Sequence, residues 1–261
     1  MIRALWFYPA AAVLTLILAG RIVVASWLKR PSVPGLCRRL GRLWARTILR
    51  WCRVRVSFEG LDRVNWDEPM ILVANHQSWF DVFALAGELP ITPRFIAKKE
   101  LSRIPVFGRA WQNCGHIAVD RSDQARAIAS LQDVGDRLGE DGLAVLFFPE
   151  GTRSRDGRLQ RFKKGAFVLA IQTQAPVVPL GIVGSRAVMP KGSFRIRPGH
   201  IRVRVGEPIE TRGLVHADRN RLTEEGRDAV ARLAADPSSA DAGDIRSGDG
   251  ASNQTEPGEQ T

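Results

Sequence analysis

The chain contains little from which a metal centre or a disulfide framework could be built. No C-x-x-C spacing joins its three cysteines, Cys37, Cys52 and Cys114. Its four histidines are scattered along the chain, at His76, His116, His200 and His216. A zinc site needs several Cys or His ligands at short spacings, so we expect no metal site. Few and unpatterned cysteines also predict no disulfide framework and are typical of a reducing compartment.

Acidic residues are also scarce. The chain has 27 Asp and Glu against 38 Lys and Arg, a net charge of +11 over 261 residues. The final 26 residues hold six acids and one Arg, a net −5, which leaves about +16 on the rest. A basic body of this kind needs an anionic partner: nucleic acid, an anionic membrane or a phosphorylated substrate. No internal repeat is visible, and the length suits one substantial domain.

The N-terminus favours a membrane among these partners. Ala4–Gly20 is uncharged and mostly apolar, and the apolar run resumes after Arg21 as far as Leu28. Seventeen uncharged residues are at the short end of what spans a bilayer, and Pro9 and Arg21 interrupt the run. No small-x-small cleavage site of a signal peptide follows. We expect residues 1–56 to be a membrane-associated helical segment, attached from one side in preference to crossing.

The segment Gly35–Val56 carries seven arginines interleaved with Leu, Ile and Trp. Basic residues on one side of a helix and aromatic and aliphatic residues on the other are typical of an interfacial membrane helix. The alternative is a surface helix that packs on its own domain. If Ala4–Leu28 does span, the arginines that follow it predict a catalytic domain on the cytoplasmic side of the cell membrane.

Strands and helices alternate through the rest of the chain. The apolar and alternating patterns predict strands at Arg55–Glu59, Met70–Ala74, Arg94–Ala97, Gly115–Val119, Leu143–Phe148 and Val177–Val183. Helices are predicted at Asp81–Leu89, Ser122–Leu138, Gly165–Thr173 and Glu224–Ala235, the last of them capped by Thr223. Phe194–Ile196 and Ile201–Val205 are expected to form a closing hairpin. The fold class is therefore α/β, with a mixed, largely parallel sheet flanked by helices in residues 57–235. Residues 236–261 are expected to be a disordered acidic tail.

The first chemically suggestive stretch follows the buried strand Ile71–Ala74. It places His76 and Asp81 five positions apart (H-x4-D) at the end of that strand. A histidine beside a carboxylate is the minimum equipment for general-base catalysis, because the carboxylate fixes the tautomer and stabilises the imidazolium. The plain alternative is a polar residue satisfied at a strand end.

The second stretch follows the apolar strand that ends at Phe148. Pro149 and Gly151 bracket a tight turn, Thr152 offers a hydroxyl, and Arg153 offers a planar fork suited to phosphate oxygens. More cations follow, at Arg155, Arg158, Arg161, Lys163 and Lys164. The spacing is not that of a P-loop. The pattern indicates a phosphate or carboxylate cradle; the alternative, for the residues after Ser154, is a solvated basic loop.

These stretches resemble the motifs of the glycerolipid acyltransferases. Asn75–Asp81 resembles motif I (N-H-x4-D) and Phe148–Ser154 resembles motif III. Gly115–Arg121 is similar to motif II, Val177–Ile182 to motif IV, and Ala97–Leu101 occurs between the first two as in the family. All four motifs stand in order, and the resemblance covers roughly residues 58–210. It implies a glycerol-3-phosphate acyltransferase-like fold with membrane-bound N-terminal helices.

The resemblance also implies a reaction. A fatty acyl group would pass from acyl-CoA or acyl-acyl carrier protein to the sn-2 hydroxyl of lysophosphatidic acid, with phosphatidic acid as product. His76 would be the general base and Asp81 would orient it. Gly151, Thr152 and Arg153 would hold the acceptor phosphate in a substrate-binding loop that Glu150 organises. No metal or tightly bound cofactor is required.

Two further cations, Lys98 and Arg121, are candidates for binding the phosphate or the developing oxyanion. The alternative for both is ordinary surface charge. His116 occupies a variable position of motif II, so it is assigned no chemical role.

Three other interpretations stay open on the sequence. The same chemistry could serve another acceptor, such as a lyso-phospholipid or a lyso-aminolipid. A non-catalytic membrane-binding protein would not need His76 and Asp81 together. A nucleic-acid-binding protein is suggested by the charge alone; it would show salt-sensitive binding, and no motif supports it.

Overall fold

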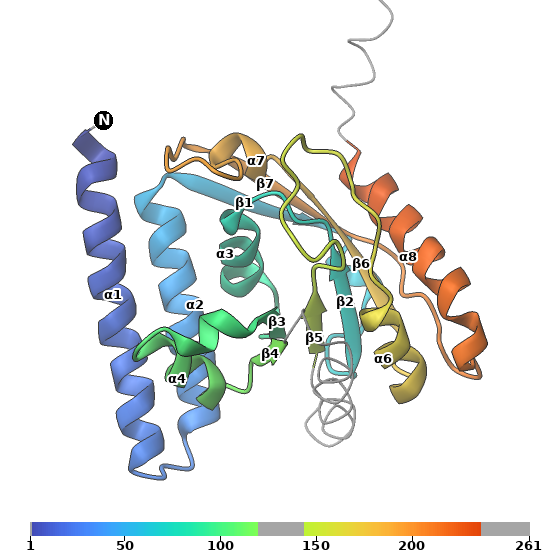
Figure 1. The fold of residues 1–261 in the computed structure, drawn as a ribbon, viewed down its shortest axis with the longest axis horizontal. Helices are drawn as coiled ribbons and strands as arrows, with labels where there is room; N and C mark the ends of the chain where they lie inside the picture. Colours follow the sequence, from blue (N-terminus) through green and yellow to red (C-terminus); the bar gives the residue numbers. More distant parts are fainter. Residues whose placement is uncertain (1, 120–143, 236–261) are drawn as a thin grey trace, which may run out of the picture.

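A computed structural model describes residues 2–119 and 144–235 (Figure 1). These residues form a seven-stranded sheet with the order β1-β7-β6-β2-β5-β3-β4. The strands are β1 (Val54–Glu59), β2 (Met70–Ala74), β3 (Arg94–Lys98), β4 (Ile117–Val119), β5 (Ala144–Phe147), β6 (Val177–Val183) and β7 (Gly199–Val205). Every neighbouring pair is parallel except β6 with β7. The predicted α/β class, with a mixed and largely parallel sheet, is confirmed.

Helices cover both faces of the sheet (Figure 1). They are α1 (Ile2–Trp27), α2 (Val33–Trp51), α3 (Trp79–Glu88), α4 (Phe107–Asn113), α6 (Gly165–Thr173), α7 (Ser185–Val188) and α8 (Arg219–Ala234). Short 3-10 turns lie at Leu61–Arg63, Lys99–Arg103 and His216–Asp218. Most of the strands and helices expected from the sequence lie within two residues of these bounds.

The central strands are apolar on both faces because both faces are covered. Successive side chains of a strand point to opposite faces. In β2, Leu72 and Ala74 join the core cluster that contains residues of α2 and α3. Ile71 and Val73 join the cluster that contains residues of α6 and α8. This double burial explains why β2 is a continuous apolar run rather than an alternating one.

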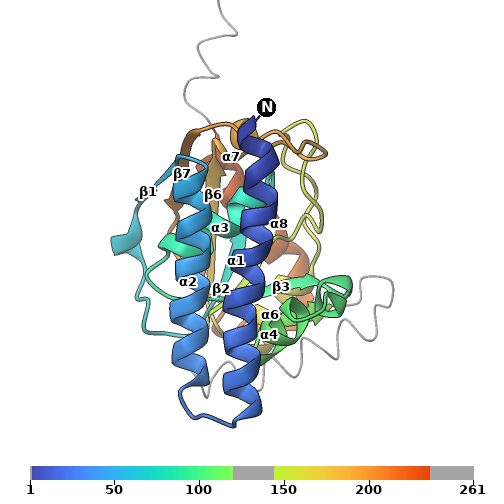
Figure 2. The same ribbon diagram turned by 90° about the vertical axis from the view of Figure 1, so that its left-hand side faces the viewer.

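The two N-terminal helices lie antiparallel, side by side, at one end of the molecule (Figure 2). The stretch Trp6–Trp27 of α1 has a mean hydropathy of 1.9 and is long and apolar enough to cross a membrane. Several of its large apolar side chains are more than half exposed: Trp6, Val13, Leu16, Ile17, Val24 and Trp27. This exposed apolar surface indicates membrane association.

Helix α2 packs on its own domain along one side. Its buried residues are Cys37, Leu40, Ala45, Ile48 and Leu49. Arg42 donates from Nη2 to the carbonyl of Leu89 at 2.7 Å, and Arg46 donates from Nε to that of Gly87 at 2.9 Å. These two arginines satisfy carbonyls at the C-terminal end of α3, which have no partner within the helix. Part of the arginine pattern that predicted an interfacial helix therefore serves packing within the fold.

Two local predictions are wrong. Residues 194–196 form no strand; β7 pairs antiparallel with β6 and parallel with β1, so no closing hairpin exists there. Helix α8 begins at Arg219, and Thr223 lies inside it, where its hydroxyl donates to the carbonyl of Arg219 at 2.6 Å. The predicted helix Ser122–Leu138 and the expected tail 236–261 lie outside the described residues.

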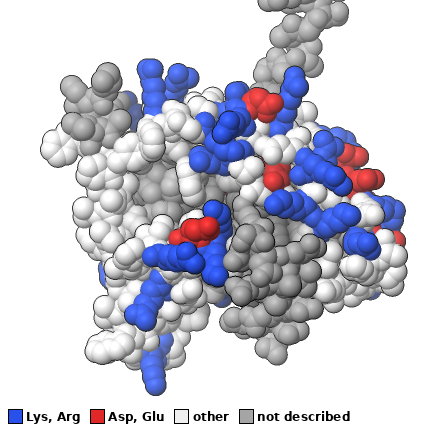
Figure 3. All heavy atoms as spheres, viewed as in Figure 1, with Lys and Arg blue, Asp and Glu red and all other residues white. Residues whose placement is uncertain are grey.

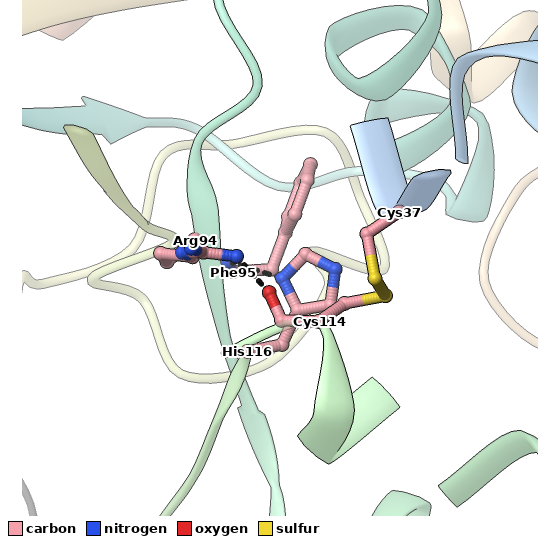
Figure 4. Close-up of a disulfide and its surroundings, with 5 residues drawn as sticks. All are labelled: Cys37, Arg94, Phe95, Cys114 and His116. Carbon is pink, nitrogen blue, oxygen red and sulfur yellow. Dashed lines mark hydrogen bonds between the residues drawn. A yellow bond between two sulfur atoms is a disulfide. The ribbon is translucent and has the colours of Figure 1, made fainter. Parts of the chain in front are cut away.

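The expectation of no disulfide is also wrong. Cys37 of α2 and Cys114, just after α4, form a disulfide across 77 positions of sequence, with their Cα atoms 5.5 Å apart (Figure 4). No spacing in the sequence marks this pair, because α1, α2 and α4 pack together only in the folded chain, where Leu40 and Ala110 join the same buried cluster. Such a bond is typical of an oxidising compartment and contradicts the inference from cysteine scarcity.

His116, which is partly buried, lies beside this disulfide (Figure 4). The backbone N–H of Phe95 donates to its Nδ1 at 3.2 Å. Burial, with the positive charge of Arg94, lowers the pKa of His116 to about 3. It is therefore neutral at physiological pH, and its Nδ1 accepts a backbone hydrogen bond.

We predict that loss of the Cys37–Cys114 bond lowers the free energy of unfolding by about 2–4 kcal/mol, because the bond restricts the unfolded chain. Urea titration of the C37S/C114S variant in detergent measures the loss. A reductant should produce the same loss in the wild type and none in the variant. The control variant C52S, which changes the buried free cysteine, should lose stability on reduction as the wild type does. Equal free energies of unfolding for oxidised wild type and C37S/C114S would contradict the prediction.

Candidate active site

The two motif-bearing stretches meet at one edge of the sheet. Strands β2 and β5 are parallel neighbours, with Val73 paired to Phe147. Their carboxyl ends therefore point the same way, and the residues after them lie together. His76 follows the end of β2 by two residues, and Glu150 follows the end of β5 by three. Side chains beyond the carboxyl ends of parallel strands are where α/β proteins build their sites.

The H-x4-D spacing is the geometry of a helix N-terminus. Ser78 is the N-cap of α3, its hydroxyl accepts from the N–H of Phe80, and Asp81 completes a capping box. The same Asp81 Oδ2 accepts from His76 Nδ1 at 2.8 Å, from the N–H of Gln77 at 2.7 Å and from that of Ser78 at 2.8 Å. Asp81 is fully buried, and the positive end of the helix favours its charge.

This contact determines which nitrogen of His76 is basic. An ionised carboxylate only accepts hydrogen bonds, so Nδ1 carries the proton and the lone pair lies on Nε2. The ring stacks on Phe148, with centroids 4.0 Å apart and planes inclined by 17°. The side chain is 14% exposed. His76 is thus held in one tautomer and one orientation, as a general base requires.

Glu150 joins the second loop to the first. Its Oε1 accepts from the backbone N–H of His76 at 2.6 Å, and its Oε2 accepts from that of Gln160 at 3.0 Å. Burial raises the pKa of Glu150 above its ordinary value of 4.5, while the two amides and His76 oppose that shift. Both oxygens are occupied by the protein itself, so the carboxylate organises the loop.

Further bonds fix the two loops to each other. The N–H of Ser154 donates to the carbonyl of His76 at 2.8 Å, and the side chain of Gln77 donates to the carbonyl of Gly157 at 3.1 Å. Asn75 is buried and exchanges two hydrogen bonds with the backbone of Ile182 in β6, at 2.9 and 2.7 Å. The loop that carries His76 and the basic loop are therefore joined by several hydrogen bonds.

The predicted phosphate loop presents its cations to solvent. Gly151 adopts φ +74°, a left-handed conformation that favours glycine, and the end of the Lys163 side chain lies beside it. Thr152 is exposed, and the guanidinium of Arg153 lies 5.1 Å from the ring centroid of Trp79. Such a cation–π contact holds the guanidinium in place. Figure 3 shows Lys and Arg side chains gathered around this loop.

The remaining candidates stand differently. Lys98 ends β3, two strands from β2, and its Nζ pairs with Glu100 at 2.8 Å; both side chains are more than half exposed. Arg121 lies outside the described residues.

Sequence reasoning missed Lys191, which reaches Thr152 and Arg153 from the loop after α7. No signal in the sequence marks it, because it lies 38 residues beyond Arg153 and outside every motif. Among residues 2–119 and 144–235, no group of three or more His, Cys, Asp or Glu side chains could hold a metal ion.

Comparison with known proteins agrees with this geometry. The family described as Acyltransferase matches residues 55–183, which contain both loops. A 1-acyl-sn-glycerol-3-phosphate acyltransferase from Limnanthes douglasii is 37% identical over 177 residues, 66% of this chain and 62% of the relative. The alpha form from Homo sapiens is 34% identical over 177 residues, 68% and 62% of the two chains. The match thus spans somewhat less than two thirds of these curated relatives.

A solved structure covers more of the chain. The crystal structure of the 1-acyl-sn-glycerophosphate (LPA) acyltransferase PlsC from Thermotoga maritima matches with a TM-score of 0.74 and 29% identity. The match covers 90% of this chain and 96% of that one. Residues 55–183 thus belong to the Acyltransferase family, and the chain is similar in sequence and fold to 1-acyl-sn-glycerol-3-phosphate acyltransferases.

We predict that Glu150→Gln lowers the free energy of unfolding by about 1–3 kcal/mol. The oxygen of the glutamine side chain can accept from one of the two backbone N–H groups, of His76 or of Gln160. Its NH2 group then faces the other N–H, and neither of these two donors has an acceptor. The pKa of Glu150 is raised, so the folded protein binds this proton more tightly than the unfolded chain. The stability of the wild type therefore falls as the pH rises from 4.5 through the pKa of Glu150 in the folded protein. The variant has no titrating group at this position, so its stability lacks this pH dependence.

Urea titrations of both proteins between pH 4 and pH 7.5 test this. The stability difference between wild type and variant should shrink as the pH rises. A difference that grows with pH would mean that the folded protein favours the carboxylate, contrary to the raised pKa.

Proposed function

We propose that this protein transfers a fatty acyl group from acyl-CoA or acyl-acyl carrier protein to the sn-2 hydroxyl of lysophosphatidic acid, giving phosphatidic acid. The observation that carries the proposal is that the histidine proposed as general base is hydrogen-bonded to the loop proposed to bind phosphate. The backbone of His76 is bonded to Glu150 at 2.6 Å, and Arg153 stands three residues beyond that glutamate. The curated relatives bear the name of this reaction.

The chemistry follows from the orientation of His76. Nε2 takes the proton of the acceptor hydroxyl while the oxygen attacks the thioester carbonyl carbon, and a new C–O bond forms. The tetrahedral intermediate collapses, the C–S bond breaks, and the thiolate takes the proton back from the imidazolium. Asp81 stabilises the imidazolium in between. No protein nucleophile is needed, because the acceptor alcohol attacks directly.

The loop after β5 supplies acceptor recognition in this proposal. Arg153 offers paired N–H donors to phosphate oxygens, and Thr152 and the backbone of Gly151 offer further contacts. Glu150 is excluded from direct contact, because two anions would repel and both of its oxygens accept from backbone amides. Lys98, held by Glu100, and Arg121 remain secondary candidates for the phosphate or the oxyanion.

We propose that residues 1–56 attach the enzyme to the membrane, that residues 57–235 form the catalytic domain, and that residues 236–261 are an acidic tail. The apolar surface of α1 supports attachment. The arginines of α2 favour a cytoplasmic catalytic domain, whereas the Cys37–Cys114 bond favours an oxidising side. Labelling of an introduced surface cysteine with a membrane-impermeant maleimide from either side distinguishes the two.

The test is acyl transfer from labelled oleoyl-CoA to lysophosphatidic acid by the detergent-solubilised protein. Wild type should form phosphatidic acid. His76→Ala should lose about 10²–10⁴-fold in kcat, because the general base is gone. His200→Ala changes an exposed histidine whose side chain is hydrogen-bonded only to Ser57 among the described residues. This variant should have the activity of the wild type. Equal activity of wild type and His76→Ala would refute the role of His76.

A further inference from the structure

The loop between α7 and β7 brings a lysine onto the phosphate loop. The ammonium of Lys191 donates to Oγ1 of Thr152 at 2.8 Å and to the carbonyl oxygen of Arg153 at 2.7 Å. Lys191 is partly buried, unlike its exposed neighbours in the same loop, Gly192, Phe194 and Arg195. A lysine that reaches across to another loop with two hydrogen bonds has a fixed position.

The position of Lys191 is set by contacts on either side of it. Ser78, the N-cap of α3, donates from its hydroxyl to the carbonyl of Met189 at 2.7 Å, in the interior. Further along, Tyr8 of α1 donates from its hydroxyl to the carbonyl of Phe194 at 2.5 Å, and the two rings meet edge to face at 6.1 Å. The loop is thus tied to the helix that carries Asp81 and to the membrane-associated helix.

The charge balance of the site calls for a second cation. A phosphate monoester carries about −1.5 to −2 charges near pH 7. Arg153 supplies one positive charge, the charge of Lys98 is paired with Glu100, and the side chain of Lys163 lies beside Gly151. Of the other cations among the described residues, Lys191 is the one whose ammonium contacts both Thr152 and Arg153. Lys191 holds its ammonium 2.8 Å from the Thr152 hydroxyl, so a phosphate oxygen that accepts from this hydroxyl would lie within reach of Nζ. Lysine acts there as a compact point charge beside the planar fork of arginine.

We propose that Lys191 is a second cationic ligand of the acceptor phosphate, beside Arg153. Its ammonium turns from Thr152 and the Arg153 carbonyl toward the phosphate when the acceptor binds. This inference rests on the proposed function, since it names a further residue for the same site. The competing role is structural, in which Lys191 only supports the loop.

The test compares steady-state kinetics of wild type, K191M, K191Q and K191R with lysophosphatidic acid as the varied substrate. K191M and K191Q should raise KM about 10- to 100-fold and change kcat less than about threefold, because they remove a charge-assisted bond to bound phosphate. K191R should stay within about threefold of wild type, because it keeps the charge. R195M removes one charge from the same loop at an exposed position and should leave KM unchanged.

Two results would overturn the proposal. One is a KM for K191M equal to that of R195M. The other is a fall in kcat with unchanged KM that K191R fails to restore, which would indicate loop support alone. K191Q keeps N–H donors for Thr152 and the Arg153 carbonyl, so it decides the matter if K191M does not fold in a thermal unfolding assay.

The two proposals can fail separately. If wild type transfers no acyl group to lysophosphatidic acid, the proposed reaction is wrong. Equilibrium binding of lysophosphatidic acid to the detergent-solubilised proteins then tests Lys191 without turnover. Binding weakened about 10-fold or more in K191Q but not in R195M supports the phosphate contact, and equal binding in both variants refutes it.

Discussion

The Oδ2 oxygen of Asp81 accepts three N–H groups: the ring of His76 and the backbone amides of Gln77 and Ser78. One buried atom therefore caps α3 and orients the ring of His76. The H-x4-D spacing follows from this double use, because the histidine stands two residues before the N-cap and the aspartate stands at the third helical position. Anything that loosens the first turn of α3 would also release the imidazole, so the stability of this turn and the orientation of His76 depend on the same contact.

Glu150 organises the loop after β5, as Asp81 organises the loop after β2. Burying a carboxylate is costly unless its oxygens are hydrogen-bonded, and here both accept from backbone amides, one of them that of His76. The site is thereby built from the ends of β2 and β5 as one unit. The loop after α7 adds Lys191 and links that unit to Tyr8 of the membrane-associated helix. The loop after β5 and the membrane-associated helix are thus connected through the loop after α7.

The strands of the sheet and the two stretches of the candidate site could be predicted, because their sequence signals are local. Apolar runs marked β2 and β5, and each run ended in the polar residues that form the site, so pairing of the two strands was enough to bring His76 and Arg153 together. The disulfide, Lys191 and the α3-capping role of Arg42 could not be predicted, because each depends on packing between elements far apart in sequence. The start of α8 was missed because Thr223 has the character of a cap, yet its hydroxyl bonds back to Arg219 within the helix.

The most direct test of the account is the tautomer of His76. The chain has four histidines, so ¹⁵N-histidine labelling with long-range proton–nitrogen NMR in micelles resolves the rings, and His76→Ala assigns the signal. In the neutral ring, we expect Nδ1 to carry the proton and Nε2 to show the chemical shift of a nitrogen with a free lone pair. In Asp81→Asn this preference should be lost. A wild-type ring protonated on Nε2 would contradict the account, because the nitrogen that must take the acceptor proton would already hold one.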